Sequence, residues 1–159
     1  GAEKLVIEGE SFEAFNTSGG CATMCETYAD KVENLTYKTI RYPGHLNHMK
    51  FLFNDLHLKK NKDILEKLFD KEVPRTKNDL IIFFVKVIGL IDGVLQEKTY
   101  LRKIYGDEKF SAIQLTTASG ACSALKMFLD GKISSKGFIK QESLSWNDFV
   151  DNKFGSVYK

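Results

Sequence analysis

The pattern of the sequence changes from that of a strand to that of a helix within residues 35–45, which read Leu35-Thr36-Tyr37-Lys38-Thr39-Ile40-Arg41-Tyr42-Pro43-Gly44-His45. Its β-branched and aromatic side chains favour a strand, and Pro43-Gly44 then favours a turn. Apolar residues follow at three- and four-residue intervals, which predicts a helix: Leu46, Met49, Leu52, Phe53 and Leu56. We therefore expect Arg41 and His45 at a strand-to-helix corner, where a cationic side chain and free backbone N–H groups can bind a carboxylate or a phosphate. The alternative is that Arg41 only ends an exposed strand and His45 only caps the helix.

The composition is that of an ordinary folded domain. The chain has 159 residues, of which 43% are hydrophobic and 28% charged. Its 23 basic and 21 acidic residues are well mixed and give a net charge of +2, which argues against a nucleic-acid partner. The longest apolar run, residues 80–85, is too short to span a bilayer, so no membrane partner is expected. Three cysteines fit a reducing compartment, and the sequence therefore predicts a cytoplasmic protein.

The first residues suggest that the chain was cut from a longer protein. It begins with Gly1-Ala2 instead of methionine, and strand-like residues follow almost at once. We expect residues 1–2 to be a cloning scar and residues 3–159 to be one domain.

A cluster of turn-forming residues precedes the first expected helix. Two short strands are predicted at residues 5–7 and 12–15, and a helix from about residue 21 to 30. Between them, Ser18, Gly19 and Gly20 offer a hydroxyl, backbone donors and room for a ligand to approach the backbone closely. The alternative is a plain capped loop, because two adjacent glycines are a weak phosphate signal.

The strongest local pattern is a β-hairpin. Leu80–Ile91 and Val94–Tyr105 are rich in strand-forming residues, and Asp92-Gly93 between them favours a type I′ turn. The first arm is apolar on both faces, which predicts a strand in the middle of a sheet. The second arm carries charged residues, so one of its faces is expected to meet solvent or a partner, and a dimer interface is one possibility.

The rest of the chain is mainly helical in pattern. Helices are predicted at about residues 63–71, 110–129 and 145–152, and a short strand at 137–139. Thr116 and Thr117 either cap the longest helix or lie in its first turns, where their hydroxyls bond preceding carbonyls. The sequence thus predicts an α+β fold: two layers, with a mixed, largely antiparallel sheet and helices on one face.

Other arrangements of reactive residues do not form a recognisable site. Cys21 and Cys25 with His45 and His48 lack the spacing of a structural zinc site, so no metal is expected. No third residue can be named to orient a Cys–His nucleophile. The loop pair Asp107-Glu108 looks solvated and does not suggest a glycosidase dyad.

Four segments together resemble the C-terminal domain of saccharopine dehydrogenases, most closely the bacterial, glutamate-forming type. They occur in the same order in this chain, and R-Y-P-G-H is the most specific part: residues 13–20 (EAFNTSGG), 37–45 (YKTIRYPGH), 111–118 (SAIQLTTA) and 136–142 (KGFIKQE). The resemblance covers essentially the whole chain. Cys21-Ala22 departs from the pattern, because a bulkier apolar residue and another glycine are expected after Gly20.

This resemblance implies a two-domain oxidoreductase. A Rossmann domain would bind NAD or NADP, and the present chain, which contains no Gly-x-Gly-x-x-Gly motif, would bind no cofactor itself. It would supply the substrate half of the cleft and the contact of a homodimer. Saccharopine would be oxidised at its secondary amine, and hydrolysis of the imine would release glutamate and aminoadipate semialdehyde.

The resemblance also suggests roles for individual residues. Saccharopine carries three carboxylates, so Arg41 is the candidate for a bidentate carboxylate contact. Ser18, Gly19 and Gly20 are candidates for donors at a helix start, and Thr116 and Thr117 for neutral hydrogen bonds. His45 is a weak candidate for proton transfer, and the catalytic residue is otherwise unknown.

Two other functions remain open from the sequence. Carboxynorspermidine synthases and lysine 6-dehydrogenases also act on amines through an imine, with fewer carboxylates to bind. The chain by itself could instead be a non-catalytic module for ligand binding or oligomerisation.

Overall fold

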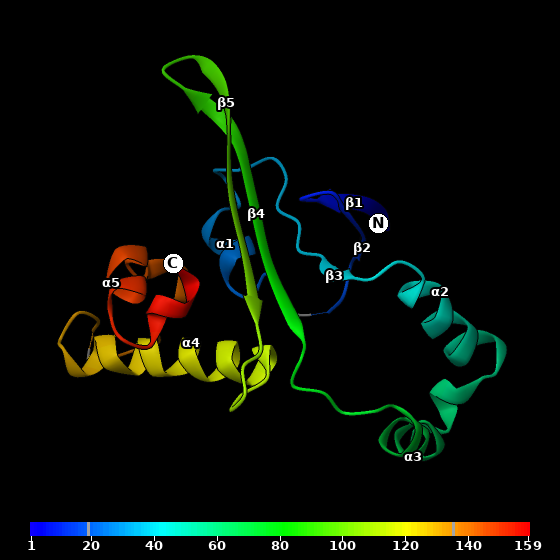
Figure 1. Cartoon of the computed structure of the whole chain (residues 1–159). Coiled ribbons are helices and arrows are strands. Elements are labelled where there is room, and N and C mark those ends of the chain that lie inside the picture. Colours follow the sequence, from blue (N-terminus) through cyan, green and yellow to red (C-terminus); the bar gives the residue numbers. More distant parts are fainter. Residues whose placement is uncertain (19, 135) are drawn as a thin grey trace. The chain divides into compact units, whose positions relative to one another are not determined.

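The computed structural model describes residues 1–18, 20–134 and 136–159, and the chain forms two compact units. Unit 1 comprises Gly1–Arg75 and unit 2 comprises Thr76–Lys159. Both units combine helices with antiparallel strands, so the predicted α+β class is confirmed (Figure 1). The prediction of one mixed sheet is wrong for the described residues, which form two separate sheets.

Unit 1 contains a three-stranded antiparallel sheet in the order β1-β2-β3, followed by short helices. Its buried apolar residues are Ile7, Phe12 and Ala14 in the sheet and Leu65 among the helices. The strands are β1 (Glu3–Ile7), β2 (Glu10–Phe15) and β3 (Thr39–Arg41), and the helical elements are α1 (Met24–Thr27), α2 (His45–Lys50), the π-helical turn η1 (Phe51–Asp55), the 3₁₀ turn η2 (Leu58–Lys60) and α3 (Lys62–Glu72).

Two elements of unit 1 are shorter than their patterns suggest. The helix expected at residues 21–30 reduces to α1, because Ala22 has a left-handed backbone (φ 44°) that cannot belong to a helix. The helix expected after Gly44 continues as α2 only to Lys50 and then widens into the π-helical turn η1. The helix predicted at 63–71 is confirmed as α3.

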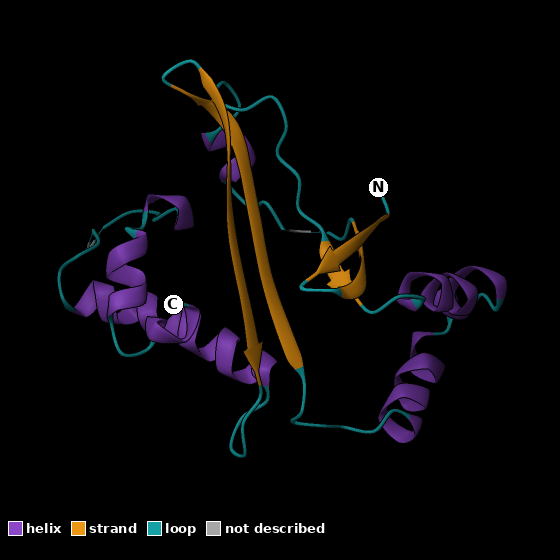
Figure 2. Ribbon diagram, turned by 45° about the horizontal axis from the view of Figure 1, so that its top comes forward, coloured by secondary structure: helices purple, strands orange, loops and turns teal. Residues whose placement is uncertain are grey.

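Unit 2 is built on the predicted hairpin, formed by β4 (Leu80–Ile91) and β5 (Val94–Tyr105). Figure 2 shows it as a long two-stranded ribbon. Asp92 (φ 52°) and Gly93 (φ 77°) both have the positive φ of a type I′ turn, as predicted. The expected position of β4 in the middle of a sheet is wrong, because β5 is its only strand partner in the described part of the chain. Apolar patterning on both faces cannot distinguish a strand buried by a larger sheet from one that remains exposed.

The helices of unit 2 follow the hairpin. They are α4 (Ala112–Leu129), the 3₁₀ turn η3 (Gln141–Ser143), α5 (Trp146–Asp151) and the 3₁₀ turn η4 (Gly155–Tyr158). Helix α4 begins with a capping box, in which Ser111 and Gln114 each bond the other's backbone N–H group. The strand expected at residues 137–139 does not form, and Gly137 there has a left-handed backbone (φ 86°). Within the described residues, every helix is too short or too polar to traverse a bilayer.

Candidate functional site

The strand-to-helix corner of unit 1 does bind a carboxylate, but that carboxylate belongs to the chain itself. Glu13 on β2 lies opposite Arg41 on β3 in the antiparallel register. Its Oε2 accepts a hydrogen bond from the backbone N–H of Gly44 (3.0 Å), and its Oε1 accepts one from that of Leu46 (2.6 Å). These two bonds lower the pKa of Glu13 and keep it ionised at neutral pH. Two donors that the sequence predicted for a ligand are thus used to fix the geometry of the corner.

Arg41 is left with its charge exposed at this corner. It is the last residue of β3, and its Nη1 donates to the carbonyl oxygen of Ile40, the preceding residue, at 3.0 Å. A guanidinium has five N–H donors in a planar fork, so this bond leaves the group able to bind a carboxylate. The backbone that carries Arg41 is fixed by the pairing of β3 with β2.

His45 lies at the same corner and is neutral at pH 7. Its ring stacks on Phe15, with centroids 6.1 Å apart and planes 13° apart. The pKa of His45 is lowered, first because partial burial desolvates the charged ring and second because Arg41 lies nearby. Since α2 begins at His45 and Gly44 is its N-cap residue, His45 is the first helical residue and not the cap. A neutral imidazole beside an exposed guanidinium can accept a proton.

The glycine-rich segment borders a separate hollow in unit 1. This hollow has a volume of about 490 Å³ and is lined by Asn16, Thr17, Gly20, Cys21, Ala22, Leu35, Thr36 and Tyr37. A Cβ atom on Gly20 would lie 1.8 Å from Cδ1 of Tyr37, so only glycine permits this packing. Ser18 is exposed next to the lining residues, and the prediction for Gly19 falls outside the described residues.

The two threonines belong to unit 2 and differ in exposure. Thr116 is buried, and its hydroxyl donates to the carbonyl oxygen of Ala112 at 2.8 Å. This is the intrahelical bond that was the alternative interpretation from the sequence. Thr117 is exposed on the surface of α4. Of the pair, Thr117 has the more accessible hydroxyl.

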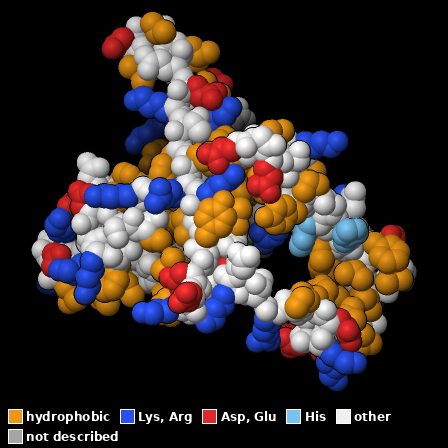
Figure 3. All heavy atoms as spheres, in the orientation of Figure 1, with side chains coloured by type: hydrophobic (Ala, Val, Ile, Leu, Met, Phe, Trp, Pro, Cys, Tyr) orange, Lys and Arg blue, Asp and Glu red, His pale blue; other side chains and the backbone are white. Residues whose placement is uncertain are grey.

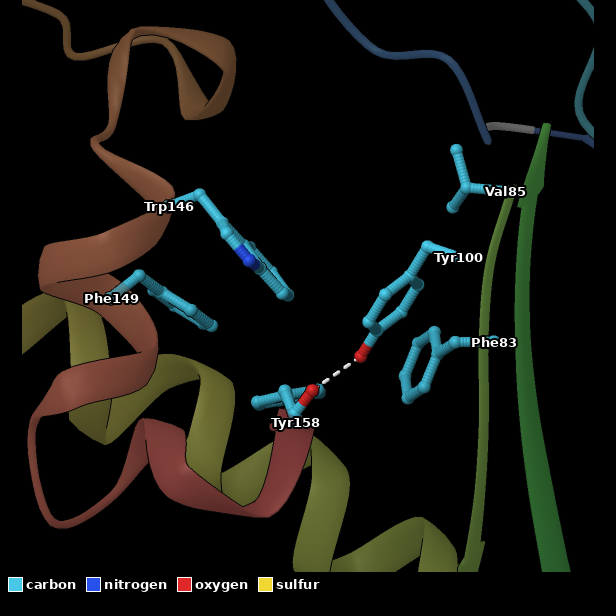
Figure 4. Close-up of a pocket in the computed structure, with 6 residues that line it drawn as sticks. All are labelled: Phe83, Val85, Tyr100, Trp146, Phe149 and Tyr158. Atoms are coloured by element: carbon cyan, nitrogen blue, oxygen red, sulfur yellow. Dashed lines mark hydrogen bonds between the residues drawn. The ribbon is translucent and has the colours of Figure 1, made fainter. Parts of the chain in front are cut away.

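Unit 2 also contains an aromatic cavity that the sequence did not predict (Figure 4). Its volume is about 440 Å³, and it is lined by Phe83, Val85, Tyr100, Trp146, Phe149 and Tyr158. The rings of Tyr100 and Trp146 meet edge to face at 5.5 Å, and those of Phe83 and Tyr158 do so at 5.4 Å. The lining residues come from β4, β5, α5 and η4, so only the tertiary fold brings them together.

Both tyrosine hydroxyls of this cavity are bonded to backbone carbonyls. The hydroxyl of Tyr100 donates to the carbonyl oxygen of Tyr158. The hydroxyl of Tyr158 donates in turn to the backbone carbonyl oxygen of Thr116 at 2.5 Å. Burial raises the pKa of both tyrosines, so both hydroxyls stay protonated. The exposed lining is therefore almost wholly apolar.

The sequence-predicted residues thus fall into three groups. Arg41 and His45 lie together at the corner, Gly20 borders the hollow, and Thr116 and Thr117 lie on α4 of the other unit. Sequence reasoning missed Glu13, whose only signal was an acidic residue between the apolar residues of a strand. Residues 1–18, 20–134 and 136–159 contain no cluster of three or more His, Cys, Asp or Glu side chains that could bind a metal ion.

No family model matches the chain, and no solved structure matches it.

Proposed function

We propose that this chain is the substrate-binding domain of a cytoplasmic, NAD(P)-dependent saccharopine dehydrogenase of the glutamate-forming type. The proposal starts from the four sequence segments that resemble this family. One structural observation supports it most directly: residues 13–20 and 37–45, two of these segments, meet as the neighbouring strands β2 and β3. The most specific motif therefore begins with an arginine whose side chain is exposed and whose backbone is held by pairing with the other segment.

In this proposal the corner binds one carboxylate of the substrate. Arg41 provides a bidentate contact, while Glu13 holds the backbone at Gly44 and Leu46. Neutral His45, beside Arg41, is available to accept a proton. Ser18, Gly20 and Thr117 are further candidates for hydrogen bonds to the substrate.

The nicotinamide cofactor is assigned to another domain of the whole protein. The chain has no Gly-x-Gly-x-x-Gly or Gly-x-x-x-x-Gly-Lys-Ser/Thr sequence, so its residues do not fit a dinucleotide site of those types. When bound there, NAD⁺ or NADP⁺ would accept a hydride from the carbon next to the secondary amine of saccharopine. Water would then hydrolyse the imine to glutamate and aminoadipate semialdehyde.

The test is an absorbance assay of nicotinamide reduction in a protein that joins this chain to its cofactor-binding domain. Arg41→Ala is expected to raise the KM for saccharopine by about 10- to 100-fold, because a hydrogen bond to a charged group contributes roughly 1.5–3 kcal/mol. Arg75→Ala is the control, since Arg75 is an exposed arginine of the same unit that pairs with Asp70 at 2.9 Å. It should leave the KM unchanged.

Two outcomes would contradict the proposal in different ways. If Arg41→Ala had the same kinetics as the unmodified protein, the corner would not be the substrate site. If carboxynorspermidine or lysine were oxidised and saccharopine were not, the function would be that of a related imine-forming enzyme.

A further inference from the structure

The aromatic cavity of unit 2 is bordered by rings that contact one another in series. In Figure 4 the side chains of Trp146 and Phe149 point from α5 toward those of the β4–β5 ribbon. Neighbouring ring centroids lie 5.4 to 6.0 Å apart in the order Tyr100, Trp146, Phe149, Tyr158 and Phe83. Both tyrosine hydroxyls donate to backbone carbonyls, so neither donates to a ligand. A bound group would therefore meet mainly the faces and edges of aromatic rings.

The cavity is large enough for a ring system and is open to solvent. Its volume of about 440 Å³ falls within the range of ~300–1,000 Å³ that is typical of ligand pockets. A closed apolar cavity of roughly 150 Å³ already binds benzene. Two lining residues, Val85 and Trp146, are 52% and 51% exposed, so a ligand can enter without unfolding of the unit. An aromatic ligand would pair with the lining rings by stacking or edge to face.

The face of the ribbon that lines the cavity carries basic residues only. Residues directly opposite each other in an antiparallel pair share a face, and Phe83 is paired with Arg102 and Val85 with Tyr100. Along β5 this face carries the exposed residues Lys98 and Arg102 and no acidic residue. Burial raises the pKa of Tyr100, and the nearby charge of Arg102 opposes that shift. Arg102 thus lies beside the cavity with a guanidinium that can bind a carboxylate.

The acidic residues of α5 are each paired with a lysine and do not offset this positive charge. Asp148 forms an ion pair with Lys132, and Asp151 forms one with Lys159 at 2.7 Å. Aromatic rings attract cations, but an ammonium ligand here would meet the like charge of Arg102. An anionic ligand would instead meet an opposite charge. The charges therefore favour an anion among aromatic ligands.

We propose that the aromatic cavity binds a small aromatic carboxylate, with the ring inside the cavity and the carboxylate at the guanidinium of Arg102. The ring displaces water from an apolar surface, while the carboxylate stays at the exposed edge of the cavity and remains partly hydrated. The inference goes beyond the proposed function and does not rest on it, because saccharopine has carboxylates but no ring.

The first experiment compares three probes with the same phenylpropyl skeleton and different charge, using the fluorescence of Trp146 in the 159-residue chain. Trp146 is the only tryptophan and lines the cavity, so binding should change its emission. We expect 3-phenylpropanoate to bind with a Kd of about 1 mM or lower, more tightly than 3-phenylpropanamide, and 3-phenylpropylammonium to bind least tightly.

A pair of charge variants tests the role of Arg102. Arg102→Gln should weaken the binding of 3-phenylpropanoate about three- to tenfold and leave that of the amide unchanged, because only the carboxylate pairs with the guanidinium. Lys86→Gln is the control, since Lys86 is a β4 cation next to Val85 on the other face of the ribbon. It should leave the affinities of both probes unchanged.

A second pair of variants tests whether the probe occupies the cavity. The hairpin continues past the cavity, and Figure 3 shows hydrophobic side chains exposed at its outer end, where a probe could also bind. Val85→Phe should fill the cavity and weaken binding at least about tenfold. Val87→Phe is the control, because Val87 lies on the same face, is 62% exposed and does not line the cavity. Circular dichroism should show that both variants are folded.

Three results would overturn the proposal. An absence of binding by 3-phenylpropanoate would show that the cavity is not a site for this class of ligand. Equal or tighter binding of the amide or the ammonium probe would show that the site does not select a carboxylate. Equal affinities of Val85→Phe and Val87→Phe would place the probe outside the cavity. None of these measurements uses saccharopine, so the substrate assignment at Arg41 is judged separately.

Discussion

Ser123, which is fully buried on α4, is expected to stabilise unit 2 through hydrogen bonds alone. Its hydroxyl donates to the carbonyl oxygen of Phe149 at 2.6 Å and accepts from Nδ2 of Asn152 at 2.7 Å. In Ser123→Ala both partners keep another bond, because Asn152 Nδ2 also lies 3.0 Å from the Phe149 carbonyl oxygen. The expected loss in the free energy of unfolding is therefore about 1–2 kcal/mol, towards the lower end for a buried hydrogen-bonding group.

A second substitution separates hydrogen bonding from packing. The space beside Ser123 is full: a Cβ atom on Gly155 would lie 2.9 Å from the Ser123 hydroxyl oxygen. Ser123→Val removes the same bonds and adds methyl groups to this space, so it should cost roughly 1–3 kcal/mol more than Ser123→Ala.

The assay is urea unfolding followed by the fluorescence of Trp146, the only tryptophan in the sequence and a residue of unit 2. If the same unit is unfolded by heat instead, the loss of about 1–2 kcal/mol in Ser123→Ala corresponds, for a unit of this size, to a decrease in Tm of about 4–16 °C. Ser143→Ala is the control, because the exposed Ser143 hydroxyl also donates to a carbonyl at 2.6 Å, that of Lys140. The reasoning would be refuted if Ser123→Ala were as stable as Ser143→Ala, or if Ser123→Val were as stable as Ser123→Ala.

Two pH-dependent predictions concern the corner of unit 1. The folded pKa of Glu13 is depressed, so its ionised form stabilises unit 1 above the unfolded pKa, and this contribution is lost as the pH falls from about 5 through the folded value. In an acid titration by NMR, the amide shifts of Gly44 and Leu46 should follow this midpoint, and Glu13→Gln should abolish it; a persisting midpoint would assign it to another group. For His45, the imidazole titration should have a midpoint below the ordinary value, and Arg41→Ala should raise it by removing a nearby like charge. An unchanged midpoint in Arg41→Ala would show that the two side chains are not coupled.

Local sequence signals predicted those parts of the fold that local interactions determine. The Asp92-Gly93 turn was predictable because type I′ geometry requires positive φ at both residues, and α3 because its apolar residues share one face. The number of strands in a sheet depends on distant segments, and so the position of β4 was predicted wrongly. Gly137 was included in a short apolar run, but its left-handed backbone excludes a regular strand.

The candidate site was predictable to a similar extent. Pro43-Gly44 placed Arg41 and His45 at the end of one element and the start of the next, which the structure confirms. The role of Glu13 was not predictable, because it depends on the pairing of β2 with β3 across a long intervening loop. The aromatic cavity was missed for the same reason, since its lining residues have no common sequence motif.

The hydrogen bonds of Tyr158 mean that the last residues of this chain are part of its folded architecture. Tyr158 accepts a bond from Tyr100 at its carbonyl, donates one to Thr116 through its hydroxyl, and packs its ring against Phe83. Cleavage of the backbone just before Tyr158 would therefore remove a wall of the aromatic cavity and leave the Tyr100 hydroxyl without this acceptor. Here, cleavage just before Tyr158 would have the consequences of a mutation in the core.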